Sequence, residues 1–122
     1  MFEGVNASNG IGIGTAQVAV DPDLTFTPHT VEDTAAEKAR YAEAVTKFIA
    51  QTNAQIERMT KTVGEEAAAI MGAHIEFAED EGIKEAVNGA IDGGTCVEQA
   101  VSDAYDMYYN MFSNMDDELF RE

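Results

Sequence analysis

Residues 64–83 read GEEAAAIMGAHIEFAEDEGI, and this segment predicts a helix that is apolar on two sides. At 100° per residue, one narrow arc of the helix collects Ala68, Met71, Ile75 and Ala78. A second arc lies nearly opposite the first and contains Glu66, Ala69, Ile70, Ala73 and Phe77, with His74 at its margin. A helix with one apolar stripe needs one packing partner, so two stripes indicate two partners.

Two interpretations of the second stripe stay open. Acidic residues border it at positions 65, 66 and 79–81. Buried helix faces rarely carry so many carboxylates, which favours a docking face for another protein. A helix in the middle of a bundle can nevertheless be apolar nearly all round, because it packs on two sides. The first stripe is predicted to be core in both interpretations.

The composition limits both the size and the partners of the chain. Its 122 residues fit one domain with a small core. With 23 acidic and 7 basic residues, the net charge is −16. This charge argues against nucleic acid and anionic membranes as partners, since both are bound by Lys and Arg clusters. A basic protein partner fits the charge, although acidity alone can also serve solubility. We find neither a signal peptide nor an apolar run long enough to span a bilayer.

The residues that could carry chemistry are few. The single cysteine, Cys96, cannot form an internal disulfide, which is compatible with a reducing cytosol, and no basic neighbour activates it. His29 is interpreted as a solvated linker residue, and His74 lacks an orienting partner in the sequence. The acidic cluster at 76–81 lacks the spacing of an EF-hand and is interpreted as a solvated face. We therefore expect no catalytic residue, metal or cofactor in this chain.

The remaining segments predict a mainly α fold, an antiparallel bundle of about three helices. The first helix covers about residues 31–62, with Thr30 as N-cap and Asp33 completing a short capping box. Gly64 ends it, and Gly82 is expected to kink or break the middle helix before a further helical piece at 83–91. The last helix is predicted to start at Thr95, with Glu98 completing a capping box. Its predicted core stripe consists of Val97, Val101, Ala104, Tyr108, Met111 and Met115.

A short extended segment precedes the helices. Glycines at 10, 12 and 14 have the wrong spacing for a phosphate loop, and residues 15–20 look like a strand. A single strand has nothing to pair with in a chain whose remainder is helical. Spare apolar faces and an unpaired strand together indicate a piece of a larger protein or an obligate oligomer.

Three motifs resemble one known family. Residues 4–16 read GVNASNGIGIGTA and resemble the opening of enzyme I, the phosphoenolpyruvate–protein phosphotransferase of the bacterial sugar phosphotransferase system. Residues 64–81 resemble the helix by which that family contacts its carrier protein HPr, and Asp116-Asp117-Glu118 is a weaker third match. The matches keep the family's order and cover nearly the whole chain.

The resemblance implies a division of the chain and a role for it. Residues 1–29 would belong to the swivelling phosphohistidine domain, and residues 30–122 would be the helical HPr-binding subdomain, truncated before its last helix. The parent enzyme would pass phosphate from phosphoenolpyruvate through a histidine to HPr for sugar uptake in the cytoplasm. That histidine and the Mg²⁺ site would lie in regions beyond this chain, so the chain alone is not expected to be active.

The resemblance also implies a set of HPr-contacting residues. They are Glu65, Glu66, Ala69, Ile70, Ala73, His74, Phe77, Glu81 and Ile83. The apolar members would be buried against HPr, and the carboxylates would meet its basic residues. Met107, Phe112 and Met115 would flank this surface. The chain departs from the family at Asn9, where proline is usual, and at Gly82, where an acidic residue is common.

Two other functions remain open beside HPr docking in enzyme I. The chain could come from a related phosphoenolpyruvate-dependent transferase, such as a nitrogen-system paralogue or a multiphosphoryl fusion. It could also be a non-enzymatic acidic helical interaction module. In each case the surplus apolar faces lead us to expect self-association of this chain as a dimer.

Overall fold

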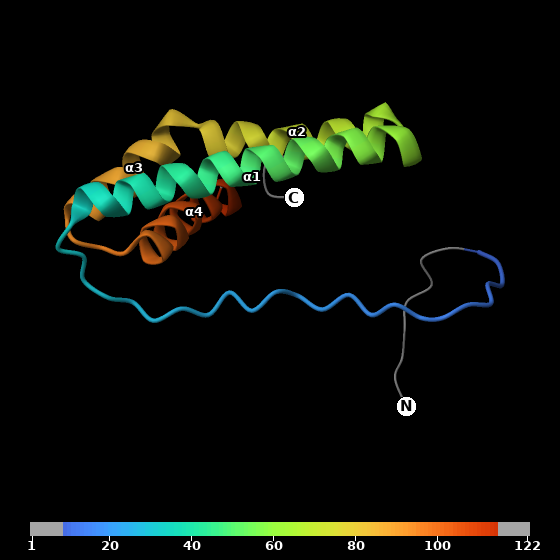
Figure 1. Ribbon diagram of the computed structural model, residues 1–122, viewed down its shortest axis with the longest axis horizontal. Helices are drawn as coiled ribbons and strands as arrows, with labels where there is room; N and C mark the ends of the chain where they lie inside the picture. Colours follow the sequence, from blue (N-terminus) through green and yellow to red (C-terminus); the bar gives the residue numbers. More distant parts are fainter. Residues whose placement is uncertain (1–8, 115–122) are drawn as a thin grey trace.

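The structure, a computed structural model, describes residues 9–114 and contains four helices there (Figure 1). They are α1 (Thr34–Thr62), α2 (Glu65–Glu79), α3 (Glu81–Asp92) and α4 (Val97–Ser113). Helices α1 and α2 form a long hairpin, while α3 and α4 pack beside the first half of α1. The prediction of a mainly α fold is confirmed. The helix count rises from about three to four because the break in the middle helix is complete.

Helix α1 begins at a different cap from the predicted one. The Asp33 side chain accepts the Ala36 N–H at 2.9 Å, so Asp33 and not Thr30 is the N-cap. Thr30 instead forms an antiparallel bridge with Thr95, and the Val31 N–H donates to the Gly94 carbonyl at 2.8 Å. The start of α1 is thereby tied to the loop between α3 and α4.

The turn between α1 and α2 confirms the role predicted for Gly64. Its φ of 105° lies in the left-handed region, which side chains other than glycine rarely adopt. The N–H groups of Val63 and Gly64 both donate to the Met59 carbonyl and close the last turn of α1. Helix α2 starts at the next residue, so α2 runs antiparallel to α1 and packs along it.

The middle helix breaks at Asp80, two residues before the predicted position. Asp80 is extended, with ψ of 127°, and its carboxylate accepts the Ile83 N–H at 2.9 Å. The same residue thus ends α2 and caps α3. Gly82 lies inside the first turn of α3 instead of at the break. An N-capping carboxylate is worth about 1 kcal/mol, which explains why the new helix starts at Asp80.

The core lies between α1, α3 and α4. Its buried members are Tyr41, Ile83, Val87, Ile91, Val97, Ala100 and Ala104. Val101 and Tyr108 pack against this cluster, which confirms most of the apolar stripe predicted for the last helix. Met111, predicted to be core, is exposed near the end of α4.

Helix α4 does not begin with the predicted capping box. Cys96 is the N-cap and makes no side-chain cap hydrogen bond. The Val97 N–H is instead bonded to Glu37 Oε1 of α1 at 2.8 Å. Glu98, the residue expected to close the box, forms an ion pair with Arg40. The predicted box is wrong because a carboxylate 60 residues away takes its place.

The segment before α1 is extended and exposed. Residues 9–29 form neither helix nor strand, and the predicted strand at 15–20 pairs with no described residue. Ile11, Ile13, Val18 and Val20 all point into solvent. The predictions for residues 4–8, for Met115 and for residues 116–118 concern positions outside the described residues.

Candidate functional site

The inner and outer faces of α2 differ as the two-stripe pattern predicts. Ala68 and Ala78 are buried, and Met71 and Ile75 are partly buried, which confirms the first stripe as core. On the opposite face, Ile70 is 69% exposed and Phe77 is 50% exposed. Among residues 9–114, α2 packs only on α1 and α3. The second stripe is therefore an unpartnered face of the described chain, not the second packing side of a buried helix.

Most of the predicted site residues lie on this open surface. Exposed are Glu65, Glu66, Ala69, Ile70, Ala73, His74, Phe77 and Glu81. We call these eight residues the α2 face. They come from one helix and from the first residue of the next, so the break at Asp80 fixes their arrangement.

Ile83 was predicted to belong to this surface, and that prediction is wrong. Its side chain is only 2% exposed and lies in the core with Val87 and Ile91. The physical reason is the break at Asp80, which starts a new helix with a new rotational phase. Spacing of four residues then aligns positions 83, 87 and 91 on the inner side of α3.

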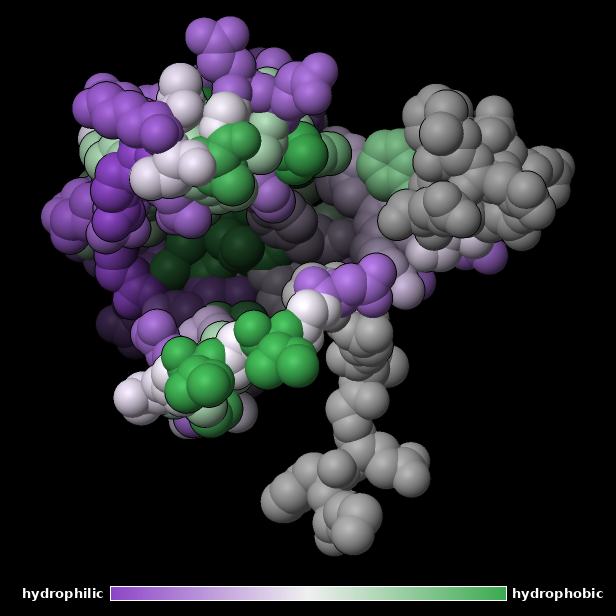
Figure 2. Space-filling view, turned by 90° about the vertical axis from the view of Figure 1, so that its right-hand side faces the viewer, coloured by the Kyte–Doolittle hydropathy of each residue, from purple (hydrophilic) through white to green (hydrophobic). Residues whose placement is uncertain are grey.

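The carboxylates and ammonium groups around the α2 face are unevenly divided, because α2 itself contributes four Glu and neither Lys nor Arg. Glu65 and Glu66 occupy the first turn of α2, where the helix dipole favours negative charge. Helices α2 and α4 contain no Lys or Arg at all. Figure 2 views the molecule from the end where α1 turns into α2, and hydrophilic groups there surround a few hydrophobic side chains.

Lys84 is the basic residue nearest in sequence to the α2 face, and it is already paired. Its ammonium lies 3.0 Å from Glu81 Oε1, and this hydrogen bond raises the pKa of Lys84 above its ordinary value of 10.5. Glu65 and Glu66 form no ion pair with any residue from 9 to 114. An apolar centre with an acidic border can bind a protein surface with an apolar patch and basic residues around it.

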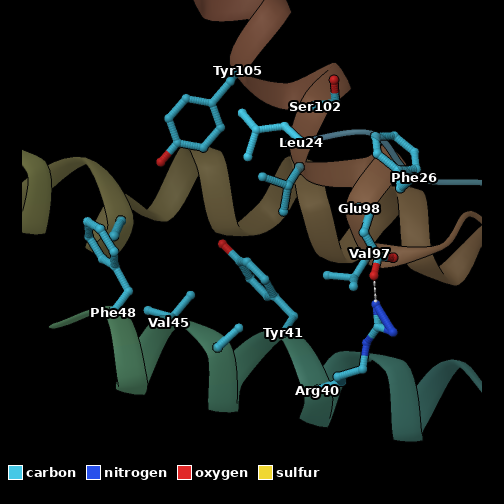
Figure 3. A pocket seen from close by; sticks show the side chains of 13 residues that line it. Leu24, Phe26, Arg40, Tyr41, Val45, Phe48, Val97, Glu98, Ser102 and Tyr105 are labelled. Atoms are coloured by element: carbon cyan, nitrogen blue, oxygen red, sulfur yellow. Dashed lines mark hydrogen bonds and ion pairs between the residues drawn. The ribbon is translucent and has the colours of Figure 1, made fainter. Parts of the chain in front are cut away.

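A second open surface lies between α1 and α4, and Figure 3 shows its side chains. It is an apolar groove of about 600 Å³. Its walls include Tyr41, Val45 and Phe48 from α1 and Val101 and Tyr105 from α4. Leu24 and Phe26 of the extended segment reach its edge, and the ion pair between Arg40 and Glu98 lies at one end.

Neither surface holds a catalytic arrangement in the described part of the chain. His29 and His74 are both exposed, and the Cys96 thiol is buried. Between residues 9 and 114, no group of three or more His, Cys, Asp or Glu side chains is placed to hold a metal ion. The helices in this range are also too short or too polar to cross a bilayer. The arrangement supports binding, and its two surfaces offer apolar contact and negative charge.

Sequence reasoning missed one residue that shapes the site, Glu37, and predicted another, Tyr108, only as a core residue. Glu37 holds the start of α4 from α1, and the ring of Tyr108 packs against the core beside Gly82. A carboxylate inside a helix gives no distinctive sequence signal, and the helical period that places Tyr108 in the core stripe does not indicate its approach to Gly82. The residues predicted to flank the surface are placed unevenly, since Met107 is exposed, Phe112 is partly buried and Met115 lies outside the described range.

Comparison with protein families finds a match along almost the whole chain. Residues 3–122 match the family described as PEP-utilising enzyme, N-terminal. A phosphoenolpyruvate-protein phosphotransferase of Enterococcus faecalis is 32% identical over 123 residues, and one of Bacillus subtilis is 30% identical over 122 residues. These alignments cover 100% and 99% of this chain but 21% of each relative. The chain thus spans about a fifth of the length of these relatives.

A solved structure has a similar fold. The N-terminal domain of Enzyme 1 - Nitrogen aligns with 84% of this chain and 44% of its own length, with a TM-score of 0.73. Sequence identity in that alignment is 19%, so the likeness concerns the fold. It matches the helical arrangement described above.

Proposed function

The chain belongs to the family of N-terminal domains of phosphoenolpyruvate-utilising enzymes, and from this membership we propose that it is the carrier-docking part of a phosphoenolpyruvate–protein phosphotransferase. The parent enzyme would transfer phosphate from phosphoenolpyruvate through an enzyme histidine to the carrier protein HPr. This chain would supply the surface that holds HPr and none of the reacting groups. The relatives that carry the enzyme's name at 30–32% identity support this proposal.

The observation that carries the proposal is the open, acid-bordered apolar stripe of α2. Complete burial of an exposed Ile or Phe side chain is worth about 1.5–3 kcal/mol. Ile70 and Phe77 are 69% and 50% exposed, so each forgoes part of this free energy. A docking partner that buries them would recover this free energy. The surrounding carboxylates would attract a basic partner, raise its association rate and set its orientation.

The wider role of the parent protein is part of the same proposal. Residues 1–29 would contribute to the swivelling domain that holds the phosphorylated histidine, and residues 30–122 would form the HPr-binding subdomain. Mg²⁺ and phosphoenolpyruvate would bind in regions outside this chain. The parent would act in the cytoplasm, in sugar uptake.

Origin from a nitrogen-system paralogue of the enzyme stays open as the alternative. The solved structure with the similar fold carries that name. At 19% identity it supports the shared fold and does not distinguish the two systems. Parallel binding measurements with the carrier proteins of both systems would distinguish them, since the cognate carrier should bind more tightly.

Charge reversal tests the proposed docking surface. Glu66→Lys should weaken HPr binding at least tenfold, because it places a positive charge where the partner is basic. Glu57→Lys is the matched control, since Glu57 is an exposed residue of α1 that does not belong to the α2 face and the change in net charge is the same. Equal affinities of the two variants for HPr, measured by calorimetry, would refute the assignment of the surface.

We also propose that the isolated chain associates with a second copy of itself through the α1–α4 groove. The groove exposes Phe48, Tyr105 and Leu24 in addition to the apolar residues on its floor. Two copies that bring their grooves together would bury the same apolar surface on both sides. A two-fold arrangement of this kind is self-complementary and closes as a dimer.

A further inference from the structure

Gly82 and Tyr108 are in unusually close approach at the start of α3. A Cβ atom placed on Gly82 would lie 2.5 Å from the Tyr108 hydroxyl oxygen and 3.1 Å from Asp80 Oδ1. Real Cβ atoms do not tolerate a neighbour at 2.5 Å, so any side chain here displaces the phenol. The glycine is therefore explained by the tyrosine on the neighbouring helix, since its φ is not in the left-handed region.

The two residues lie next to the α2 face. Gly82 directly follows Glu81, the last member of that face, and both are exposed. Tyr108 is partly buried, with its ring packed against the core cluster. Its hydroxyl makes no hydrogen bond with any residue from 9 to 114. The ring is thus anchored from inside, while the hydroxyl reaches the gap that the glycine leaves.

The hydroxyl differs chemically from its surroundings. The adjoining polar side chains at 79–81 are Glu, Asp and Glu, and ionised carboxylates only accept hydrogen bonds. The nearby ammonium of Lys84 is already paired with Glu81. A phenol can donate, so Tyr108 provides a donor in a border that otherwise accepts. Such a group selects a partner that presents an oxygen acceptor at this point.

We propose that the Tyr108 hydroxyl, reaching the surface beside Gly82, donates a hydrogen bond to the docked carrier protein, and that Gly82 keeps this place open. The inference rests on the proposed function, because it extends the α2 face to α4. It makes residues 82 and 108 a coupled pair that determines partner selection. A side chain at position 82 would push the phenol away and remove the donor.

Binding of HPr to four variants tests the proposal. Tyr108→Phe removes one oxygen and keeps the ring in place, so it should weaken binding by about three- to tenfold, the typical value of one hydrogen bond. Tyr109→Phe is the control, because Tyr109 is the adjacent, exposed tyrosine of α4, and it should bind like the wild type. Gly82→Ala should weaken binding as much as Tyr108→Phe does.

The double variant Gly82→Ala/Tyr108→Phe distinguishes binding from packing. Without the hydroxyl, the nearest Tyr108 atom to the new methyl group is Cζ at 3.8 Å, an ordinary contact. Gly82→Ala should then add no further loss of affinity, and the two changes should be strongly non-additive. Urea unfolding of each variant reports the packing effect separately.

Each outcome is decisive. Wild-type affinity in Tyr108→Phe would overturn the inference and leave the proposed function intact. Coupling that appears in the unfolding free energy but not in HPr affinity would also overturn it, because the pair would then be structural. Absence of HPr binding by the folded wild-type chain would refute the proposed function itself.

Discussion

Glu37 of α1 accepts the N–H of Val97 at the start of α4, at 2.8 Å, across 60 residues of sequence. The same carboxylate lies 3.6 Å from the Arg40 side chain, whose guanidinium also pairs with Glu98. One buried acidic residue thus caps the last helix and ties it to the first. The arrangement holds the base of α4 at a fixed place beside α1 and the core.

Removing this cap should destabilise the fold. Glu37→Ala leaves a buried N–H without its acceptor and removes a charge that favours the start of α4, so we expect a loss of about 1–3 kcal/mol. Glu37→Gln keeps an acceptor oxygen and should lose less. Glu43→Ala is the control, since it breaks only the exposed pair with Lys47 and should cost less than about 0.5 kcal/mol. Urea unfolding measures all three, and equal losses for Glu37→Ala and Glu43→Ala would contradict the role of the cap.

Replacement of Ile83 or Ile70 by alanine should affect stability and HPr binding differently. Ile83→Ala removes a core side chain and should cost about 2–5 kcal/mol of unfolding free energy. Ile70→Ala removes an exposed side chain, so it should cost less than about 0.5 kcal/mol and yet weaken HPr binding. Unfolding and calorimetry on both variants check this contrast. If Ile70→Ala lost the stability and Ile83→Ala kept it, the assignment of the two faces would be reversed.

The fold should lose stability in alkaline solution. Burial raises the pKa of the Tyr41 phenol above its ordinary value of 10.0, and burial also raises the pKa of Tyr105. The folded state thus favours the neutral phenols. Their contribution to stability is fully present below the unfolded pKa and is lost as pH rises through the higher folded value.

The substitution Tyr41→Phe should reduce the loss of folding stability at alkaline pH. The Phe variant cannot ionise, so its unfolding midpoint in urea should fall less than that of the wild type between about pH 9 and about pH 11. Tyr109→Phe, at an exposed site, should keep the wild-type decline. A Tyr41→Phe profile parallel to that of the wild type would show that burial of this phenol does not drive the decline.

Self-association should depend on the α1–α4 groove. Sedimentation velocity over about a hundredfold range of concentration should show a monomer–dimer equilibrium. Phe48→Ser removes an exposed aromatic side chain from the groove wall and should shift the equilibrium toward the monomer. Phe77→Ser, on the α2 face, should leave it unchanged. A monomer at every concentration, or a dimer sensitive only to Phe77→Ser, would rule out the groove.

The sequence predicts those features that depend on local chemistry. Gly64 ends a helix because of its backbone freedom, and the 3.6-residue period of α2 separates Ala68 from Ile70 correctly. Eight of the nine predicted site residues are exposed for the same reason. These signals need only neighbours within a few turns of helix.

The errors come from contacts between distant segments. Nothing near Val97 in sequence indicates that Glu37 supplies its cap, and nothing near Gly82 indicates that Tyr108 lies above it. Ile83 was misplaced because the helical period of α2 was continued past Asp80. The new helix α3 has a different rotational phase, so position 83 faces inward instead of outward. The sequence did contain a signal for the break, because Asp is a common N-capping residue. Asp80 accepts the N–H of Ile83, three positions later.

An NMR titration of the isotope-labelled chain with HPr from the same source tests the central claim most directly. Docking on the α2 face predicts amide shift changes concentrated on residues 65–82 and on the adjoining part of α4 around Tyr108, with little change in the first half of α1. A well-dispersed spectrum that does not change on addition of HPr, or changes confined to the α1–α4 groove, would contradict the claim.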